Sequence, residues 1–463
     1  MTAPLSWFCA IVLAGASMPQ STVGATNEFF YRADTHFMSG NQRYYYMGAN
    51  CFYLGYFAQD TTIATNGMTW RDMSDEVMTR CEDLGLGVIR VWAFNEANVQ
   101  EFSAVHADWR MQTNPGVYRE QALVGLDYVM EAARQRDLAV VLTLVNNWSA
   151  YGGMIWYVTN SPTASGAHDE FYTDGWCRQW YKDHFAVLAN RTNTFNGRVY
   201  KEDPTLFGWQ LANEPRSSSL SALTNWVCEM AAYIQSVDTN HMVSSGEEGW
   251  EPEWSLNSAC SNIDYAVMHC WPDSWWTAQS DESMYSNAMN WVADRLTTAA
   301  GEFCKPVVLS EYGRLHSQWG GPPLEATYGR HSYYRGWFDA IYTSAASDGP
   351  AAGLHFWMLE ASDSGHDDQV GSVFPSEAST IDLIRRQAAE MNTLIAPTFV
   401  SAATTPTGMR LVWSGVVGQP DYGVDVSPDL SSWQRAITVA TNTWTDPAYP
   451  STGKRFYRVV PEY

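Results

Sequence analysis

The sequence has few basic residues, and its cysteines and histidines lack the spacing of a metal site. Lys and Arg together number 27 against 50 Asp and Glu, which gives a formal net charge of −23. A field of this sign repels phosphate backbones and anionic lipid surfaces, so we expect neither nucleic acid nor a membrane as a partner. No Cys-x-x-Cys or His-x-x-x-His spacing occurs, so we predict no metal and no cofactor. A neutral substrate is compatible with the charge, and we expect a monomer.

The chain also lacks an apolar run long enough to cross a membrane. The longest candidate, LSWFCAIVLAGA at residues 5–16, is too short to span a bilayer. It resembles the core of a secretory signal, and the small residues at 23–25 suit a signal peptidase. We therefore predict a signal peptide at 1–25 and a secreted protein, extracellular or periplasmic. No Lys or Arg precedes the run, and a buried N-terminal segment is the alternative.

Eight cysteines are present, and Cys9 would leave with the signal peptide. The odd number that stays behind leaves at least one thiol free or paired between chains, although an exported protein permits disulfides. We expect mostly buried free thiols. The seven cysteines are Cys51, Cys81, Cys177, Cys228, Cys260, Cys270 and Cys304.

Eight short apolar runs alternate with helical patterns along residues 26–395. Such runs are typical of strands buried on both faces of a parallel sheet, and DEVMTRCEDLG at 75–85 shows the helical spacing between them. We predict a (β/α)8 TIM barrel as the catalytic domain. An open doubly wound sheet is the alternative, but no Gly-rich phosphate loop follows the first strand. The expected strands are Tyr46–Phe52, Val88–Ala93, Ala139–Val145, Phe207–Ala212, Met242–Ser245, Tyr265–His269, Pro306–Ser310 and Ala352–Trp357.

The composition changes near residue 395. The stretch APTFVSAATTPTG at 396–408 is rich in small residues, Thr and Pro, and indicates a linker. Short alternating runs beyond it predict a small all-β, sandwich-like module within 396–463. Trp413, Trp433 and Trp444 could form a platform for sugar, but we expect them in the core because so small a module needs its large apolar residues inside.

Polar and aromatic side chains gather where the predicted strands end, and in a barrel the carboxyl ends of the strands carry the chemistry. Glu214 follows an apolar run in GWQLANEPR, and Glu311 follows another in VVLSEYG. Pro215 predicts an extended backbone at Glu214. Either Glu could instead cap a strand end or pair with a cation. The other candidates at these ends are Arg90, Trp92, Asn147, Trp148, Asn213, His269, Trp271 and Trp357.

Two carboxylates across a cleft are typical of glycoside hydrolysis, in which one donates a proton and the other attacks the anomeric carbon. Their pKa values must lie apart. We expect Arg90 to keep Glu311 ionised, and the charge of Glu311, with aromatic walls, to hold a proton on Glu214. Asn213 would contact the 2-hydroxyl of the sugar and Trp357 would form the floor of its subsite. His269 is either a site residue or a satisfied strand-end histidine.

These motifs resemble family 5 of the glycoside hydrolases, and most of all its endo-β-1,4-mannanase branch, from about residue 29 to 394. The resemblance implies that Glu214 is the acid/base and Glu311 the nucleophile. It also implies that Arg90, Asn213 and His269 support them and that Trp357 is a sugar platform. The segments that match in order and placement are RVWAF (90–94), LVNNWSAYGG (144–153), RTNTFNGRVYKEDPTLFGWQLANEPR (191–216), HCWPDSW (269–275) and VVLSEYG (307–313).

One position departs from the family pattern. The family usually has Tyr two residues after the histidine, where its hydroxyl contacts the nucleophile, and this chain has Trp271. An indole donates through its N–H but cannot accept. We therefore expect the subsite for the cleaved sugar to differ in shape from that of the family. End-cleaving or mannobiose-releasing action stays open as an alternative.

The leading hypothesis is a secreted, metal-independent, retaining enzyme that cleaves β-1,4-mannosidic bonds in mannan, glucomannan or galactomannan. Among enzymes, the alternatives are an exo-acting β-mannosidase or mannobiohydrolase and a cellulase on the same scaffold. From another class, the chain could be a non-catalytic carbohydrate-binding protein. The presence of Glu214, Glu311, Asn213 and Arg90 together argues against such a decayed site.

Overall fold

The computed structural model describes residues 28–462 except 41, 66, 97–107, 318–319, 364–370, 395–398, 406–407, 414–420, 428–433, 441–442 and 448–455. The predicted signal peptide at 1–25, Cys9 and Trp433 lie outside the described residues.

Eight parallel strands form the central sheet, in the order β12-β11-β10-β7-β4-β15-β14-β13. The two ends of this order meet, because the backbone N–H of Asp264 donates to Val243 O at 2.8 Å and that of His269 donates to Glu248 O at 2.9 Å. The predicted (β/α)8 TIM barrel is confirmed, and each strand differs from its predicted range by a residue or two at its ends. The strands are β4 (Tyr46–Asn50), β7 (Val88–Trp92), β10 (Ala139–Thr143), β11 (Leu206–Gln210), β12 (Met242–Ser244), β13 (Ala266–Cys270), β14 (Val307–Tyr312) and β15 (Ala351–Phe356).

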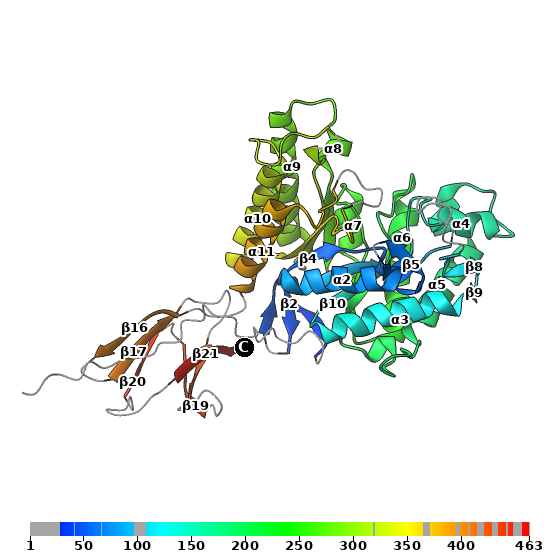
Figure 1. The fold of residues 1–463 in the computed structure, drawn as a ribbon. Helices are drawn as coiled ribbons and strands as arrows, with labels where there is room; N and C mark the ends of the chain where they lie inside the picture. Colours follow the sequence, from blue (N-terminus) through cyan, green and yellow to red (C-terminus); the bar gives the residue numbers. More distant parts are fainter. Residues whose placement is uncertain are drawn as a thin grey trace, which may run out of the picture.

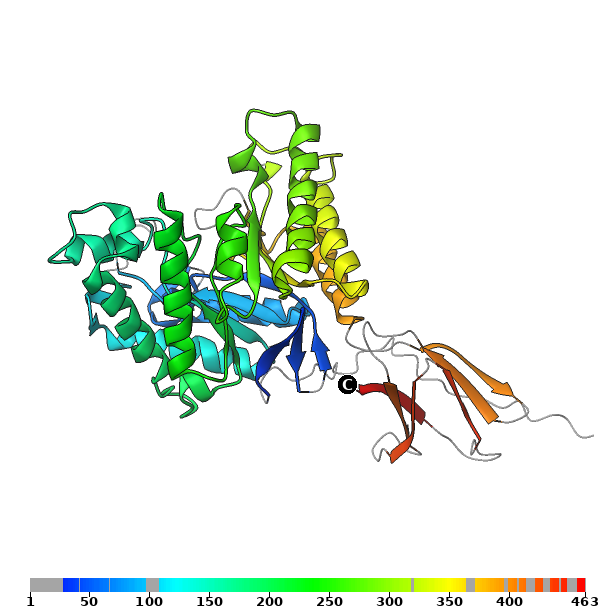
Figure 2. The same ribbon diagram turned by 180° about the vertical axis from the view of Figure 1, so that it is seen from behind.

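Helices surround these strands (Figure 1 and Figure 2). In α2 (Trp70–Asp83) the Thr69 hydroxyl accepts from Asp72 N, and the Asp72 carboxylate accepts from Thr69 N, which is a capping box. Its predicted apolar stripe, including Val77 and Cys81, is buried. The other helices are α1 (Leu54–Ala58), α3 (Glu120–Gln135), α4 (Gly153–Asn160), α5 (Gly175–Ala189), α6 (Leu220–Val237), α7 (Glu253–Ser258), α8 (Pro272–Trp275), α9 (Asp281–Thr298), α10 (Arg330–Ala346) and α11 (Ala378–Asn392), with short turns η1 (His168–Tyr172), η2 (Tyr200–Glu202) and η3 (Ala299–Phe303).

An aromatic cluster fills the amino-terminal end of the barrel. A three-stranded antiparallel sheet of β1 (Phe30–Ala33), β2 (His36–Ser39) and β3 (Gln42–Tyr44) supplies Phe30 and Phe37 to it. The barrel strands add Phe207, Tyr46 and neighbouring apolar residues. This packing leaves the carboxyl end of the strands as the place to look for a functional site. Two hairpins complete this part of the chain, β5 (Ile63–Thr65) with β6 (Met68–Thr69) and β8 (Gln112–Asn114) with β9 (Val117–Tyr118).

The C-terminal region contains two three-stranded antiparallel sheets, β16-β17-β20 and β19-β18-β21, drawn in orange and red in Figure 1. The linker prediction is wrong for Phe399–Thr405, which forms β16, because Thr and small β-compatible residues there pair with β17. Strand β20 was also not predicted. That the two sheets pack as a sandwich stays a prediction; Trp444 is half-buried. The strands are β16 (Phe399–Thr405), β17 (Gly408–Trp413), β18 (Asp421–Ser427), β19 (Gln434–Val439), β20 (Thr443–Asp446) and β21 (Phe456–Glu462).

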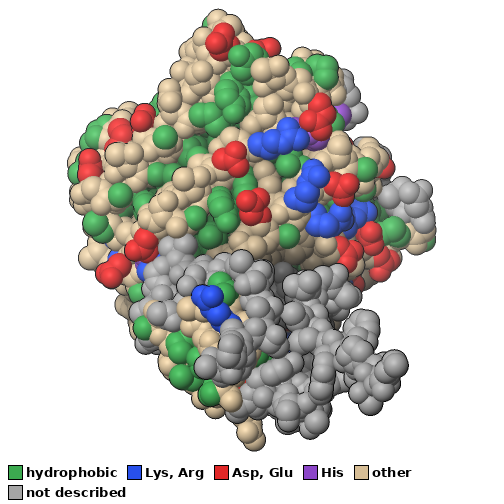
Figure 3. Space-filling model, turned by 90° about the vertical axis from the view of Figure 1, so that its left-hand side faces the viewer, with side chains coloured by type: hydrophobic (Ala, Val, Ile, Leu, Met, Phe, Trp, Pro, Cys, Tyr) green, Lys and Arg blue, Asp and Glu red, His purple; other side chains and the backbone are tan. Residues whose placement is uncertain are grey.

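The surface reflects the acidic composition. On the face shown in Figure 3, most Lys and Arg side chains gather in one area at the upper right, where Asp and Glu side chains lie around them. Among the described residues, no helix combines the length and the apolar character that crossing a bilayer requires.

Candidate active site

Two buried carboxylates, Glu214 and Glu311, meet at the carboxyl end of the barrel. Glu214 lies four residues beyond the end of β11, and Glu311 is the last residue but one of β14. The two residues are 8% and 3% exposed. One oxygen of each lies within 4.8 Å of the other and of a ring nitrogen of His269. The predicted juxtaposition of the two carboxyl groups is therefore present.

Arg90 connects Glu311 with Asn213, the residue before Glu214. Its guanidinium is fully buried and donates to Glu311 Oε1 at 2.5 Å and to Asn213 Oδ1 at 2.7 Å. It also donates to Gln210 Oε1 at 2.7 Å and to Asn50 Oδ1 at 2.9 Å. Because protein groups occupy these donors, Arg90 orients the carboxylate and the amide from below rather than from the cleft.

His269 faces both carboxylates. Its Nδ1 atom lies 2.7 Å from Glu214 Oε1 and 3.3 Å from Glu311 Oε2. A register shift between Met268 and His269 sets His269 opposite Glu311 in the pairing of β13 with β14. Such irregularities re-aim side chains beside functional sites. His269 is thus a site residue and not an isolated strand-end histidine.

The pKa directions of the two carboxyl groups are opposite to our expectation. Burial raises the pKa of Glu214, but the hydrogen bond and charge of His269, with the hydrogen bond from Trp148, outweigh it and lower the pKa. Burial raises the pKa of Glu311, and the nearby charge of Glu214 adds to this rise, although His269 and Arg90 oppose it. The expectation failed because it considered Arg90 at Glu311 and overlooked His269 as the partner of Glu214. The two carboxyl groups interact directly, so the protonation of one depends on the other.

The backbone at Glu214 also differs from the prediction. Its φ angle is 52°, in the left-handed region that side chains with a Cβ rarely adopt, and not extended as Pro215 had indicated. The Glu214 N–H donates to Gly246 O at 2.9 Å beyond β12, which fixes this turn. An uncommon backbone conformation at a residue in the site is consistent with a constraint set by its surroundings.

Trp148, Arg216 and Glu248 form a second row behind Glu214. The Trp148 indole N–H donates to Glu214 Oε2 at 2.6 Å, and the Arg216 guanidinium lies 5.2 Å from the centre of the Trp148 ring. Arg216 Nε donates in turn to Glu248 Oε2 at 2.5 Å. Burial and the charge of Glu214 raise the pKa of Glu248 to about 7.

Aromatic side chains form the opposite wall. The Trp271 indole N–H donates to Glu311 Oε2 at 3.2 Å, so the residue that replaces the expected Tyr still contacts this carboxylate. Trp357 lies edge-on to Trp271 at 6.0 Å and stacks on Phe52 at 5.4 Å. Trp92 packs on Phe52 at 4.6 Å and is nearly buried. A sugar-platform role for Trp357 and a substrate contact of Trp92 both stay predictions.

Asn213 and Asn147 connect the ends of neighbouring strands. Asn213 Nδ2 donates to Asn146 Oδ1 at 3.1 Å, while its Oδ1 accepts from Arg90. Asn147 Oδ1 accepts from the backbone N–H of Arg216 at 3.2 Å. The amide of Asn213 is therefore oriented at both ends, and its contact with a substrate hydroxyl stays a prediction.

A cavity of about 520 Å³ opens on the Glu214 side of the site. His168 and Asp169 shape it: His168 Nε2 lies 2.8 Å from Asn147 O, and Asp169 Oδ2 accepts from Ser218 N at 2.7 Å. Trp148 lines the cavity and donates to Glu214, which connects the cavity to the site. Its lining consists of Asn147, Trp148, Ser149, Ile155, His168, Asp169, Arg216, Ser217 and Ser218.

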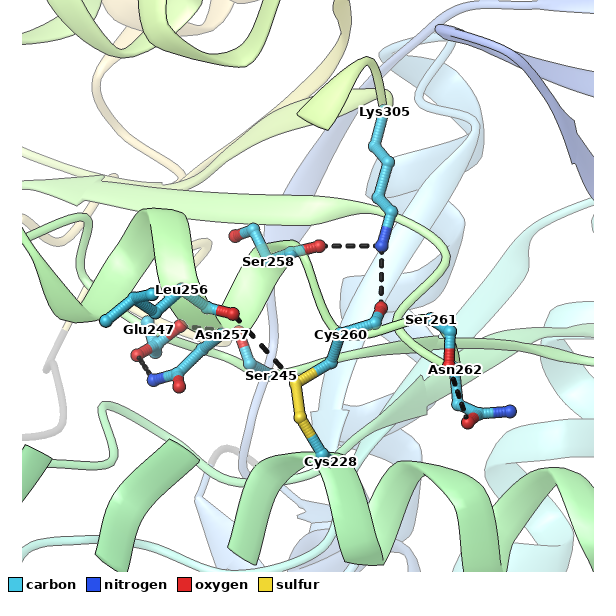
Figure 4. Close-up of a disulfide and its surroundings, with 10 residues drawn as sticks. All are labelled: Cys228, Ser245, Glu247, Leu256, Asn257, Ser258, Cys260, Ser261, Asn262 and Lys305. Atoms are coloured by element: carbon cyan, nitrogen blue, oxygen red, sulfur yellow. Dashed lines mark hydrogen bonds between the residues drawn. A yellow bond between two sulfur atoms is a disulfide. The ribbon is translucent and has the colours of Figure 1, made fainter. Parts of the chain in front are cut away.

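A disulfide lies near Glu247, which follows β12 (Figure 4). Cys228 of α6 is bonded to Cys260, and Lys305 Nζ donates to Cys260 O at 2.7 Å and to Ser258 O at 2.6 Å. Asn257 of α7 donates to Glu247 Oε1 at 2.5 Å. The other described cysteines are free, and Cys51, Cys81, Cys177 and Cys270 are buried, as expected, whereas Cys304 is exposed.

Glu214, His269 and Glu311 together offer atoms that could surround a divalent cation. A metal would need the lone pair of His269 Nδ1, and that atom is engaged at hydrogen-bond distance by Glu214. The guanidinium of Arg90 on Glu311 also repels a cation. The donor set suits a shared proton better than a metal.

Four residues of the site were not singled out from the sequence. Asn50 ends β4 and Glu248 follows β12, so the strand-end rule that identified the others applies to them. Gln210 is a polar residue within the apolar run of β11, which was a usable signal. Arg216 follows Glu214 by two residues, but nothing in the sequence pairs it with Glu248.

A family model described as glycoside hydrolase family 5, β-mannosidase-like, matches residues 27–370. A putative mannan endo-1,4-β-mannosidase 9 from rice is 33% identical over 389 residues, covering 79% of this chain and 90% of the relative. Mannan endo-1,4-β-mannosidase 1 from Arabidopsis thaliana is 30% identical over 405 residues, covering 82% and 94%.

Solved structures share the fold. An endo-1,4-β-D-mannanase from Thermotoga petrophila is similar with a TM-score of 0.62 at 28% identity, covering 75% of this chain and 99% of that one. A family 5 mannosidase from Rhizomucor miehei has a TM-score of 0.66 at 24% identity, covering 79% and 98%.

Proposed function

The chain belongs to the β-mannosidase-like group of glycoside hydrolase family 5, and we propose that it hydrolyses β-1,4-mannosidic bonds in mannan, glucomannan or galactomannan with retention of configuration. The observation that supports this most is the approach of Glu214 and Glu311, with one oxygen of each within 4.8 Å of the other. Retaining glycosidases place their two carboxyl groups about 5–5.5 Å apart, whereas inverting ones leave room for a water between them. The substrate class follows from the relatives, which are named as mannan endo-1,4-β-mannosidases.

In the first step, Glu311 attacks the anomeric carbon. Arg90 holds Oε1, so Oε2, which faces His269 and Trp271, is the oxygen presented to the sugar. The bond from the anomeric carbon to the leaving oxygen breaks as the bond to Oε2 forms. Glu214 gives its proton to that leaving oxygen.

The proton on Glu214 depends on His269. The hydrogen bond and charge of His269 lower the pKa of Glu214, so the proton on Glu214 must be held against this influence. A sugar in the cleft removes water, and burial is the influence that raises this pKa. Once Glu311 is esterified its charge is gone, and Glu214, now ionised, takes a proton from the attacking water. The water oxygen bonds to the anomeric carbon as the bond to Glu311 Oε2 breaks, which releases the sugar and restores the Glu311 carboxylate and the protonated Glu214.

In this proposal, the cavity beside Trp148 binds the part of the mannan that leaves after the bond is cleaved. Its wall includes Trp148, which donates to Glu214, and Arg216, which lies against Trp148. A ring face and hydrogen-bonding groups at that position suit a neutral sugar unit. Trp357 and Trp271 lie on the Glu311 side, where the sugar that becomes covalently bound would sit.

We also propose that the protein is exported. The apolar run at 5–16 and the small residues at 23–25 support a signal peptide at 1–25. The Cys228–Cys260 disulfide is compatible with an oxidising compartment. We further propose that residues 396–463 form a β-module that is a separate domain.

The test is hydrolysis of mannan and mannohexaose by the purified chain, with Glu311→Ala as the control. We expect reducing sugar from the wild type, a first-formed β-anomer in proton NMR, and loss of activity in the variant. A first-formed α-anomer would refute retention, and full activity of Glu311→Ala would refute the nucleophile. Product sizes from mannohexaose separate endo from exo action, carboxymethylcellulose tests the cellulase alternative, and binding without reducing sugar would support a binding protein.

A further inference from the structure

We propose that the buried ion pair between Arg314 and Asp273 is a positioning device that holds the Trp271 indole N–H against Glu311. The inference rests on the proposed function, in which Glu311 is the nucleophile. It assigns a role to two residues that contact neither the cleft nor the two catalytic carboxylates.

The pair joins the segment after β13, which begins with Trp271, to the segment after β14, the strand that contains Glu311. Asp273 lies two residues after Trp271, in the first turn of α8, and Arg314 lies three residues after Glu311. Arg314 Nη1 donates to Asp273 Oδ1, and the other oxygen, Oδ2, accepts from the backbone N–H of Leu315 at 2.7 Å. The two side chains are 3% and 12% exposed. Asp273 therefore fastens the start of α8 to the backbone that follows β14.

A second buried arginine fixes the first. Arg330, at the start of α10, is fully buried and donates from Nη2 to Arg314 O at 2.9 Å and from Nη1 to Ser372 O at 2.6 Å. The Arg314 guanidinium lies 5.2 Å from the ring centre of Tyr333, also on α10. The loops after β13, β14 and β15 are thus tied to one helix by two arginines in series.

The indole needs such a restraint because its own position is set by packing and a single hydrogen bond. Trp271 donates once, to Glu311 Oε2 at 3.2 Å. Gly313 borders the ring so closely that a Cβ there would lie 2.8 Å from Trp271 Cζ3 and 2.8 Å from Gly371 Cα. A small shift of α8 relative to the chain after β14 would therefore change both the contact with Gly313 and the reach to Glu311.

The expected consequence is on the chemical step. The indole N–H stabilises the ionised nucleophile before attack and fixes the direction of Oε2. Losing it slows glycosyl transfer to Glu311 without removing contacts on the leaving-group side, which Trp148 and Arg216 supply. Loss of Arg314 acts through Trp271, so it lowers kcat and leaves KM nearly unchanged.

A double-mutant cycle on mannohexaose hydrolysis tests this. Trp271→Phe keeps a ring and deletes the donor, and we expect kcat to fall roughly 10- to 100-fold. Arg314→Met in the wild-type background should lower kcat about 10-fold, with KM within about 2-fold. In the Trp271→Phe background the same Arg314→Met change should cost less than about 2-fold, because the donor it positions is gone. Arg314→Lys should recover part of the loss.

An equal fold loss from Arg314→Met in both backgrounds would overturn the proposal, since the ion pair would then act on something other than Trp271. If Arg314→Met does not fold, Asp273→Asn takes its place, because the amide still accepts from Leu315 N–H while losing the charge. Arg385→Met is the matched control, since Arg385 pairs with Asp382 on the exposed face of α11 and its loss should leave kcat unchanged. A wild type inactive on every mannan substrate would instead count against the proposed function.

Discussion

His269 places its Nδ1 atom 2.7 Å from Glu214 Oε1 and 3.3 Å from Glu311 Oε2, so one imidazole faces both carboxylates. Its hydrogen bond and charge help to lower the pKa of Glu214, and its charge opposes the rise that burial causes in the pKa of Glu311. A single ring therefore influences the proposed proton donor and the proposed nucleophile at once, and changing it should move both limbs of the pH profile in the same direction.

Replacing His269→Asn should shift the bell-shaped profile of kcat/KM to higher pH and lower its maximum. His269 lowers the pKa of Glu214 and opposes the rise in that of Glu311, so its loss should raise both pKa values. The two limbs report the carboxyl pair together, so both should move up. Initial rates on mannohexaose from pH 3 to 9 would show the shift, and a profile whose limbs stay in place would contradict the assigned coupling.

The loss of activity in Glu214→Ala should depend on the leaving group of the substrate. A general acid contributes about 10²- to 10⁴-fold, and this help is needed for a sugar leaving group but hardly for an acidic phenol. We expect mannan hydrolysis to fall by that factor while the first step on an aryl β-mannobioside is nearly retained, measured as a burst of phenol. Glu76→Ala, at an exposed pair with Arg80, is the control. Equal losses on both substrates would reject Glu214 as the proton donor.

Glu96 should make the protein less stable as the pH rises. Burial raises its pKa to about 8, whereas an unfolded Glu titrates near 4.5. The folded state thus binds an extra proton between these values, so this stabilisation is complete below 4.5 and is lost as the pH rises through 8. Urea unfolding measures the free energy of unfolding at pH 5 and at pH 8. Between these pH values it should fall less for Glu96→Gln than for the wild type, by up to about 1.4 kcal/mol per pH unit. If the free energy of unfolding falls equally in the wild type and in Glu96→Gln, Glu96 is ionised in the folded protein.

The disulfide should stabilise the barrel without taking part in catalysis. It links Cys228 and Cys260 across 32 positions, and closing such a loop in the unfolded chain is worth about 3–4 kcal/mol. Cys228→Ser/Cys260→Ser should therefore lower the free energy of unfolding by roughly that amount while kcat stays within about 2-fold. Cys304→Ser, at an exposed free thiol, controls for sulfur loss alone. No change in the denaturation midpoint would mean that the bond does not form.

The barrel and its two carboxylates could be predicted because they depend on local patterns. Apolar runs of strand length alternate with helical spacing, and the polar residue that ends a buried run marks the active end of the barrel. Strand β16 was missed for the converse reason, because Thr, Ala and Ser are as common in linkers as in edge strands, and only pairing with β17 decides between them.

Proton positions were not predictable in the same way. The predicted pKa order used Arg90, which lies on a predicted strand, and Glu311, which follows one. The observed order depends on distances of a few ångströms between residues of different strands. The register shift in β13 that brings His269 opposite Glu311 has no mark in the sequence. The same holds for the contact of Arg216 with Glu248 and of Arg314 with Asp273.

By itself, the sequence determined the eight-stranded architecture and the identity of the residues at its carboxyl end, because periodicity and strand length act over neighbouring positions. Only the tertiary structure decided which carboxyl group His269 approaches, how Arg90 divides its donors, and which loops the two buried arginines join. Electrostatic energies in a buried site change steeply with separation, and separation between distant parts of the chain is set by packing.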